Sequence, residues 1–288
     1  MYQKNLKFQL RLMFNKLGFK VAFTAVLLLS LWNSLYYAFL FAGHDVFNVL
    51  ASSDVFILHS ESDYNEQFRL YYIYILILPF SFSYLIDAKS KIYMLVQTRG
   101  GVKNYYLAKL TASFIGSFMV FFIPFIITVL INQIVFPADG TLIDSIRNLY
   151  AHTATITGDN LIRESVSSGV PFKWLYIYYP QWYNVLYSFF FSCVAGVLGA
   201  FVFSISFFIK KFNVFLVLPL FLLTYIQNKI DIVITNRAKT YINVNIHPYI
   251  MVKSEHGKSL FYIISLLTIM IIITLCLIKW KSSSDQIE

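Results

Sequence analysis

The side chains that could ligate a metal ion or act as catalytic nucleophiles are widely scattered in this sequence. No pair of its five histidines has the HExxH spacing that places two zinc ligands on one face of a helix. His44 beside an aspartate and His59 near a glutamate could be combined into a metal site, but we interpret both as solvated loop residues. Cys193 and Cys276 lie inside apolar runs, where neither a disulfide framework nor a metal site is expected. We therefore expect no catalytic, cofactor or metal site in this chain.

The sequence also lacks the phosphate-binding loop GxxxxGK[ST] found in many ATPases. If ATP energises this protein, the nucleotide and its magnesium ion are expected in a separate subunit. Acidic, basic and histidine side chains are missing from the middle of every predicted membrane span given below. Because such groups are kept in membranes where protons or ions are coupled to transport, this pattern argues against a proton-driven carrier or a voltage sensor.

The clearest concentration of charge near a turn is LVQTRGGVKNYYLAKL, residues 95–110. It lies between two apolar runs, and its paired glycines, Gly100 and Gly101, relax the backbone so that the loop can double back. We predict a helix over 88–98, a break at the glycines and a new helix that leads into the next apolar run. A loop of this kind is suited to docking against a partner.

The overall composition is that of a membrane protein. Of the 288 residues, 58% are hydrophobic and 13% are charged, whereas a soluble domain carries about 25% charged residues. A net charge of +9 would indicate a nucleic-acid partner in a soluble protein, but here it is read as membrane topology. We expect no nucleic-acid partner.

Six segments are long and apolar enough to cross the roughly 30 Å hydrocarbon core of a bilayer, which takes about 20 helical residues. We predict one all-α transmembrane domain with spans at residues 19–42, 70–86, 110–136, 184–209, 212–231 and 260–279. The first span is too long for a signal-peptide core and is expected to be retained. Pro79, Pro124 and Pro219 lie inside the second, third and fifth spans and predict local kinks there.

Six spans place both termini on the same side of the membrane. With the termini in the cytoplasm, 14 of the 23 Lys and Arg residues fall inside, and 11 of the 14 Asp and Glu residues fall outside. This distribution follows the positive-inside rule. We therefore predict that residues 87–109 form a cytoplasmic loop and that 137–183 and 232–259 form extracellular loops.

Residues 1–18 are predicted to form an amphipathic helix on the inner leaflet of the membrane, among its lipid headgroups. Apolar residues recur there at helical spacing, and basic residues share the opposite face. The apolar positions are Leu6, Leu10, Met13 and Leu17, and the basic positions are Lys4, Lys7 and Arg11. A basic topology anchor without a further role is the alternative interpretation.

Small side chains recur every fourth residue in the fourth predicted span, at Ser192, Gly196, Ala200 and Ser204. Such a ladder lets another helix approach closely, within the subunit or across a dimer. Just before this span, WLYIYYPQWYNVLY (174–187) gathers seven aromatic rings. We interpret them as a belt in the headgroup zone, with a substrate-contacting exit surface as the alternative.

The stretch DAKSKIYMLVQTRGGVKNYYLAKL resembles the cytoplasmic loop of the ABC-2 type permeases, the membrane subunits of ATP-binding-cassette exporters. An acidic residue ends the second span, an Arg-Gly turn follows about a dozen residues later, and a Tyr and a Lys open the third span. In that family this loop engages the nucleotide-binding subunit. The matching positions are Asp87, Arg99, Gly100, Tyr105 and Lys109, while Gly101 and Lys103 occupy more variable places.

The basic residues of this loop have two interpretations. For Lys103 and Lys109 we weigh contacts with phosphates of the inner leaflet equally with docking to a partner. For Arg99 we favour docking, because a guanidinium makes bidentate hydrogen bonds to a carboxylate or to backbone carbonyls. Asp87 is expected to pair with Lys89, Lys91 or Arg99.

The resemblance implies a permease subunit of an ABC exporter in a cell membrane, expected to be the bacterial plasma membrane. Its partners would be an ABC ATPase subunit and a second permease, identical or different. The Phe- and Tyr-rich spans favour an amphipathic or hydrophobic cargo such as a peptide, an antimicrobial or a lipid-like molecule. Two rivals stay open: a non-transport immunity or sensor subunit that binds a peptide through its outer loops, and an intramembrane enzyme that uses the outer histidines.

Overall fold

The computed structural model describes residues 2–43, 50–59, 62–90, 101–137, 172–208 and 260–287, together with helical turns at 218, 220–222, 224–227 and 229–230. These residues form helices joined by turns, with no strand among them. The helices are α1 (Tyr2–Asn15), α2 (Leu17–Leu40), α3 (Asp63–Ile77), α4 (Ser83–Ser90), α6 (Val102–Val135), α9 (Lys173–Tyr178), α10 (Pro180–Ile205) and α13 (Leu260–Ile287). Four of them, α2, α6, α10 and α13, are long and apolar enough to cross a membrane, which indicates a membrane protein.

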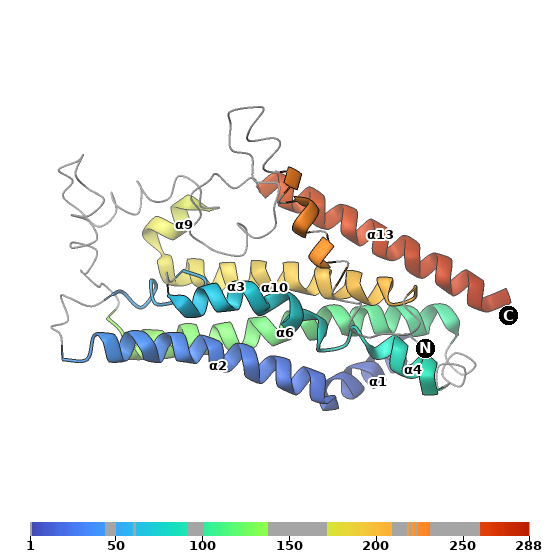
Figure 1. Cartoon of the computed structure of the whole chain (residues 1–288), viewed down its shortest axis with the longest axis horizontal. Coiled ribbons are helices and arrows are strands. Elements are labelled where there is room, and N and C mark those ends of the chain that lie inside the picture. The colour runs from blue at the N-terminus through green and yellow to red at the C-terminus, as the bar shows by residue number, and fades with distance from the viewer. Residues whose placement is uncertain are drawn as a thin grey trace.

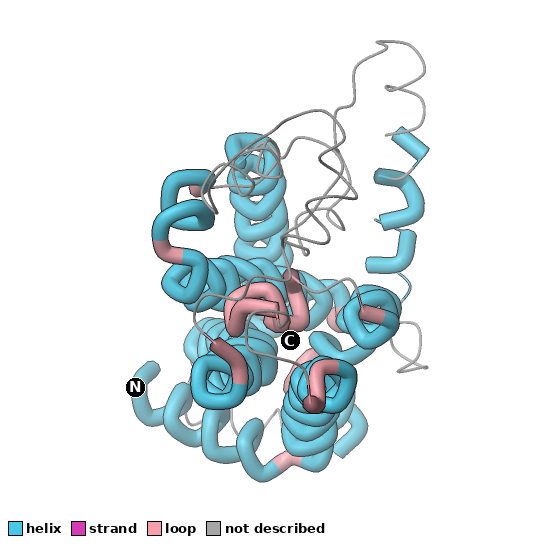
Figure 2. Tube along the Cα trace, turned by 90° about the vertical axis from the view of Figure 1, so that its left-hand side faces the viewer, coloured by secondary structure: helices cyan, strands magenta, loops and turns pink. Residues whose placement is uncertain are grey.

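Helix α6 packs against α1, α2, α10 and α13 and lies between α2 and α10 (Figure 1). Figure 2 shows the helical bundle along its long axis. Both chain ends lie at one end of this bundle, near the first turns of α6 (Figure 1). We call this the basal end, and we call the opposite end, where α6 ends and α10 begins, the distal end. Helix α4 and the two flanks of the predicted docking loop lie at the basal end (Figure 1).

The second predicted span, residues 70–86, is not one continuous helix. α3 ends at Ile77, residues 78–82 form turns, and α4 begins at Ser83. Pro79 accounts for the interruption, because it has no amide N–H and its ring would clash with the carbonyl of Ile75. The kink expected at Pro79 is therefore a complete break. Ten of the 20 residues of the fifth predicted span are described, all of them helical, and the count of six spans stays a prediction.

The broken helix is held by close contacts with α6 and α10. The last carbonyls of a helix have no partner within it, and the Oγ of Ser117 in α6 donates to the carbonyl of Leu76 at 2.8 Å. Gly199 of α10 permits this approach, because a Cβ added at that position would overlap the Ser117 hydroxyl. The hydroxyls of Ser81 and Ser113 both donate to the Gly199 carbonyl, at 3.2 and 3.1 Å. We call these five residues the serine–glycine seam.

The predicted ladder of small residues lies next to this seam on α10. All four members, Ser192, Gly196, Ala200 and Ser204, are buried. A Cβ added at Gly196 would lie 2.8 Å from the Phe114 ring of α6, so this position faces a helix of the same chain. The Ser192 and Ser204 hydroxyls donate to carbonyls of their own helix, at 2.7 Å each.

Helix α1 packs along α6. Met13 and Gln9 are buried, and the Tyr2 hydroxyl is 2.8 Å from the Thr111 hydroxyl of α6. Lys4, Lys7 and Arg11 are exposed, which agrees with the predicted division into two faces. The partner of the buried face is α6, and Leu17, expected to belong to the apolar face, is exposed at the start of α2.

The segment between α2 and α3 enters the distal end of the bundle. Within residues 50–59, which we call the distal segment, most side chains are buried, including Val55, Phe56 and His59. Side-chain amides of two helices donate hydrogen bonds to its backbone carbonyls. Asn33 donates to the carbonyl of Val55 at 2.6 Å, and Asn184 donates to the carbonyl of Ser53 at 2.8 Å. The solvated position expected for His59 is wrong, because only 1% of this residue is exposed.

Replacing Gly199 with alanine should destabilise the protein by about 1–3 kcal/mol, because the new methyl group overpacks the contact with Ser117. Denaturant unfolding of the detergent-purified chain measures this cost. The cost should fall by at least half when Gly199→Ala is made in a Ser117→Gly background, which removes the overlapping atoms. Additive effects of the two substitutions would contradict direct contact at the seam.

Candidate functional site

A buried ion pair lies at the basal end, between α4 and α6. The ammonium nitrogen of Lys109 is 2.6 Å from a carboxylate oxygen of Asp87, and only 1% of the lysine side chain is exposed. The same ammonium donates to the carbonyl of Ser83 at 2.9 Å. The rings of Tyr105 and Phe80 lie 5.2 and 5.7 Å from it, within reach of a cation–π interaction. The lysine is therefore surrounded by partners from its own chain.

Tyr105 contributes a second hydrogen bond to the same carboxylate. Its hydroxyl donates to Asp87 at 2.9 Å, and the tyrosine itself is fully buried. Tyr105 and Lys109 are four residues apart and so lie on one face of α6, above each other. One face of the first turns of α6 therefore supplies two groups that hold Asp87.

The local backbone explains how these groups meet. After the break at residues 78–82, α4 carries Ser83 and Asp87 on successive turns toward the start of α6. α6 begins after Gly101, whose φ of 76° lies in the left-handed region that glycine tolerates best. Residues 91–100 connect the two helices. The ion pair thus ties together both flanks of the loop that the sequence analysis singled out.

Lys16, which directly precedes α2, extends this cluster to a third helix. Its ammonium lies 4.9 Å from the centre of the Phe80 ring. Burial lowers the pKa of Lys16, and the nearby carboxylate of Asp87 opposes that shift. The ammonium groups of Lys16, at the start of α2, and of Lys109, in α6, therefore both lie over the Phe80 ring in the α3–α4 break. We call Lys16, Asp87, Tyr105 and Lys109 the basal cluster.

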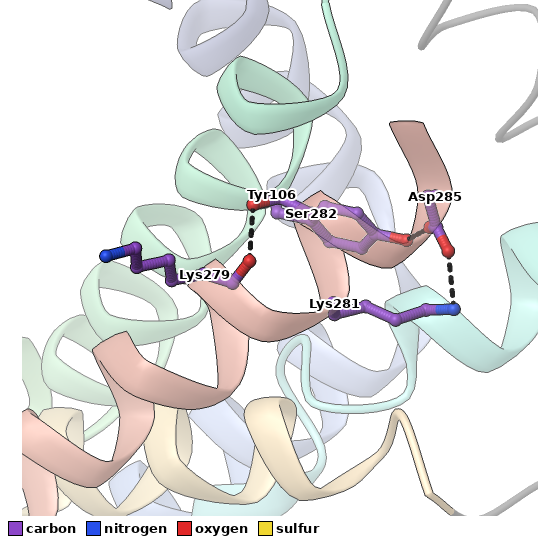
Figure 3. Close-up of polar contacts among 5 residues, drawn as sticks. All are labelled: Tyr106, Lys279, Lys281, Ser282 and Asp285. Atoms are coloured by element: carbon purple, nitrogen blue, oxygen red, sulfur yellow. Dashed lines mark hydrogen bonds and ion pairs between the residues drawn. The ribbon is translucent and has the colours of Figure 1, made fainter. Parts of the chain in front are cut away.

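A neighbouring set of contacts holds the end of α13 against α6 (Figure 3). The Tyr106 hydroxyl donates to the carboxylate of Asp285, and Lys281 pairs with the other oxygen of that carboxylate at 2.7 Å. The Tyr106 ring also packs against Phe207 near the end of α10, with ring centres 5.3 Å apart. We call the contact of Tyr106, Lys281 and Asp285 the C-terminal clasp.

The structure brings together three of the residues selected from the sequence: Asp87, Tyr105 and Lys109. Neither of the two roles weighed for Lys109 describes its position, since the buried ammonium faces Asp87 rather than lipid phosphates or a partner. Lys103 is exposed on another face of α6. Arg99 and Gly100 lie outside the described residues, as do the side chains of Lys89 and Lys91, the other cations expected near Asp87.

Sequence reasoning missed Lys16, Tyr106 and the C-terminal clasp. The four-residue spacing of Lys281 and Asp285 is typical of an ion pair on a helix surface and was the available signal. The contact between Tyr106 and Asp285 joins residues that are 179 positions apart, so no local sequence pattern could predict it. In the described part of the chain, no three metal-ligating side chains come together.

Comparison with known proteins gives no relative for this chain: no family model matches it, and neither a curated protein nor a solved structure does.

Replacing Lys109 with methionine should cost about 1–3 kcal/mol of stability, because it removes the buried ammonium that pairs with Asp87 and donates to the Ser83 carbonyl. Lys103→Met is the matched control, since this lysine is exposed on the same helix, and it should change stability by less than about 0.5 kcal/mol. Unfolding of the purified variants compares the two. Equal effects of both substitutions would contradict a structural ion pair, whereas recovery in Asp87→Asn/Lys109→Met would support it.

Proposed function

We propose that this chain is the membrane subunit of an ATP-driven exporter, and that a separate subunit binds and hydrolyses Mg-ATP. Its termini and the loop at 87–109 would face the cytoplasm of a bacterial cell, with six spans in the plasma membrane. The resemblance of the loop to that of ABC-2 permeases and the apolar, membrane-length helices support this proposal. A second permease, identical or different, would complete the pathway.

The observation that carries the proposal is the basal cluster at the foot of the loop. A subunit that pushes or pulls on residues 91–100 acts on both flanks of the loop at once, because Asp87 and Lys109 hold them together. Breaking a desolvated pair of this kind costs several kcal/mol. The flanks are thus expected to move as a unit rather than to separate.

Two paths lead from the basal cluster into the bundle. One is α4, which continues into the turns at 78–82 and so into α3. The other is α6, which runs the length of the bundle and reaches the distal segment, where the rings of Phe125 and Phe56 are 5.7 Å apart. In the proposed mechanism, ATP hydrolysis shifts α4 and α6, and the contacts at the distal end rearrange to open an outward path.

A second candidate is an immunity or sensor subunit that binds a peptide at the distal end without transporting it. The observation that favours it is a group of exposed aromatic residues at that end: Trp174, Tyr178, Tyr179 and Trp182. Such rings bind peptides well, although they also suit the headgroup zone of a membrane. In this alternative, ATPase activity of any associated subunit would not depend on the loop.

Purification of the chain from its native membrane should bring down a nucleotide-binding subunit and an ATPase activity. Arg99→Glu should reduce this association at least tenfold, because the substitution reverses the charge expected to contact the partner. Lys4→Glu is the control, since it makes the same charge change on an exposed face of α1. Absence of any ATPase in the wild-type preparation, or full association of Arg99→Glu, would refute the docking role of the loop.

A further inference from the structure

A groove lies between α6, α10 and α13, in the basal half of the bundle. Its volume is about 280 Å³, near the lower end of the range for ligand sites in proteins, which begins at roughly 300 Å³. The lining includes Leu110 of α6, Ala200 of α10 and Leu275 of α13, together with the threonines Thr111 and Thr274. A narrow, largely apolar groove of this kind suits a hydrocarbon chain.

Trp280 of α13 indicates where this groove lies relative to a membrane surface. The tryptophan is 56% exposed, and its ring stacks on Phe208 just after α10, with centres 5.4 Å apart. Exposed tryptophans on membrane helices prefer the headgroup level. Leu275 precedes Trp280 by five residues, which is about 7 Å along a helix. The groove therefore lies just inside the hydrocarbon region, below the lipid headgroups of the basal end.

The charge around the basal end of the groove is positive. The charged side chains of α6, α10 and α13 are all near this end, at Lys103, Lys109, Lys279, Lys281 and Asp285. Asp285 pairs with Lys281, and Lys109 pairs with Asp87 of α4. Lys103 and Lys279 are exposed, and neither forms an ion pair among the described residues. Helix α1, whose Tyr2 contacts Thr111 of the groove, adds three exposed cations and no carboxylate.

The helical register places the two unpaired lysines in line with the groove. Lys103 and Leu110 are seven residues apart, which is close to two full turns of α6, so they share a face. Lys279 follows Leu275 by one turn on α13. The Lys279 ammonium points away from the C-terminal clasp (Figure 3). Both lysines therefore lie on the basal side of the groove, at the level of the headgroups.

Thr274 contributes an unused hydroxyl to the groove. Only 4% of this residue is exposed, and its hydroxyl has no hydrogen-bond partner among the described residues. Four other hydroxyl side chains of α13 donate to carbonyls of their own helix, those of Ser265, Thr268, Ser282 and Ser283. Threonine divides between two χ1 rotamers in helices, which gives the Thr274 hydroxyl access to an acceptor in the groove.

We propose that this groove binds an anionic phospholipid from the membrane leaflet at the basal end. Lys103 and Lys279 contact its phosphate, the Thr274 hydroxyl donates to an ester carbonyl, and the first methylene groups of one acyl chain lie in the groove. Few bonds separate the phosphate of a phospholipid from its ester carbonyl, in keeping with the short step from Lys279 to Thr274. Basic sites between membrane helices bind anionic headgroups in this way. The binding requires no ATPase and does not rest on the proposed function.

The test uses the delipidated full-length chain in a nonionic detergent, with phosphatidylglycerol as the anionic lipid. This lipid should raise the Tm of the wild type by about 2–4 °C, in proportion to occupancy. Phosphatidylcholine with the same acyl chains should give less than half of the shift, because its choline places a further cation beside the two lysines. Glycerol 1-phosphate, which has the phosphate but no acyl chain, should give no shift.

Lys103→Gln/Lys279→Gln should reduce the phosphatidylglycerol shift to that of phosphatidylcholine, while the Tm without lipid changes by less than about 1 °C. Arg11→Gln/Lys20→Gln is the matched control and should keep the full shift. It removes the same charge from exposed positions of α1 and α2, and α2 lies on the opposite side of the bundle from α13 (Figure 1).

Two substitutions test the groove itself. Leu275→Trp fills it and should abolish the shift, whereas Ile273→Trp, at an exposed position on another face of α13, should keep it. Thr274→Val removes only the hydroxyl and should at least halve the shift, and it serves if Leu275→Trp does not fold. No shift in the wild type, an equal shift with phosphatidylcholine or glycerol 1-phosphate, or a full shift in Leu275→Trp, Thr274→Val or the double lysine variant would each overturn the site.

Discussion

The pairing of Asp87 with Lys109 is the interaction on which the organisation of the basal end depends. It joins α4, which follows the break in the chain's second apolar segment, to the start of α6, and the Tyr105 hydroxyl donates to the same carboxylate. A desolvated pair is not necessarily better than two apolar side chains, but losing one partner is costly. Its main effect is therefore geometric: it fixes the two flanks of a loop relative to each other.

Away from this pair and the C-terminal clasp, the described helices are held by close packing rather than by charge. Pro79 interrupts a helix within an apolar environment, and the Ser117 hydroxyl donates to the carbonyl of Leu76 near the end of that helix. The hydroxyls of Ser113 and Ser81 both donate to the Gly199 carbonyl of α10. Gly199 makes room for the Ser117 hydroxyl. At the distal end, the side-chain amides of Asn33 and Asn184 donate hydrogen bonds to carbonyls of the distal segment, which is not helical. Backbone irregularity inside a membrane protein is tolerated when such partners are present.

Hydropathy was sufficient to predict the long helices α2, α6, α10 and α13, because a membrane-length apolar run has few alternatives. It could not predict the break at 78–82, since the residues around Pro79 remain apolar. Asp87, Tyr105 and Lys109 were selected from the sequence, but their mutual contact depends on that break. His59 is buried and hydrogen-bonds to Asn184, which is 125 positions away in the chain. No local sequence pattern predicts such a contact.

The central claim is that the loop at the basal end controls the distal end through α4 and α6. Spin labels on cysteines at Leu40 and Trp182, both exposed at the distal end, would measure this directly in a complex with the proposed ATPase subunit, with Cys193 and Cys276 replaced by serine. Mg-ATP should change the distance between the labels in the wild type, and Lys109→Met should abolish the change while ATP still binds. An unchanged distance in the wild type, or the same change in Lys109→Met, would contradict the account.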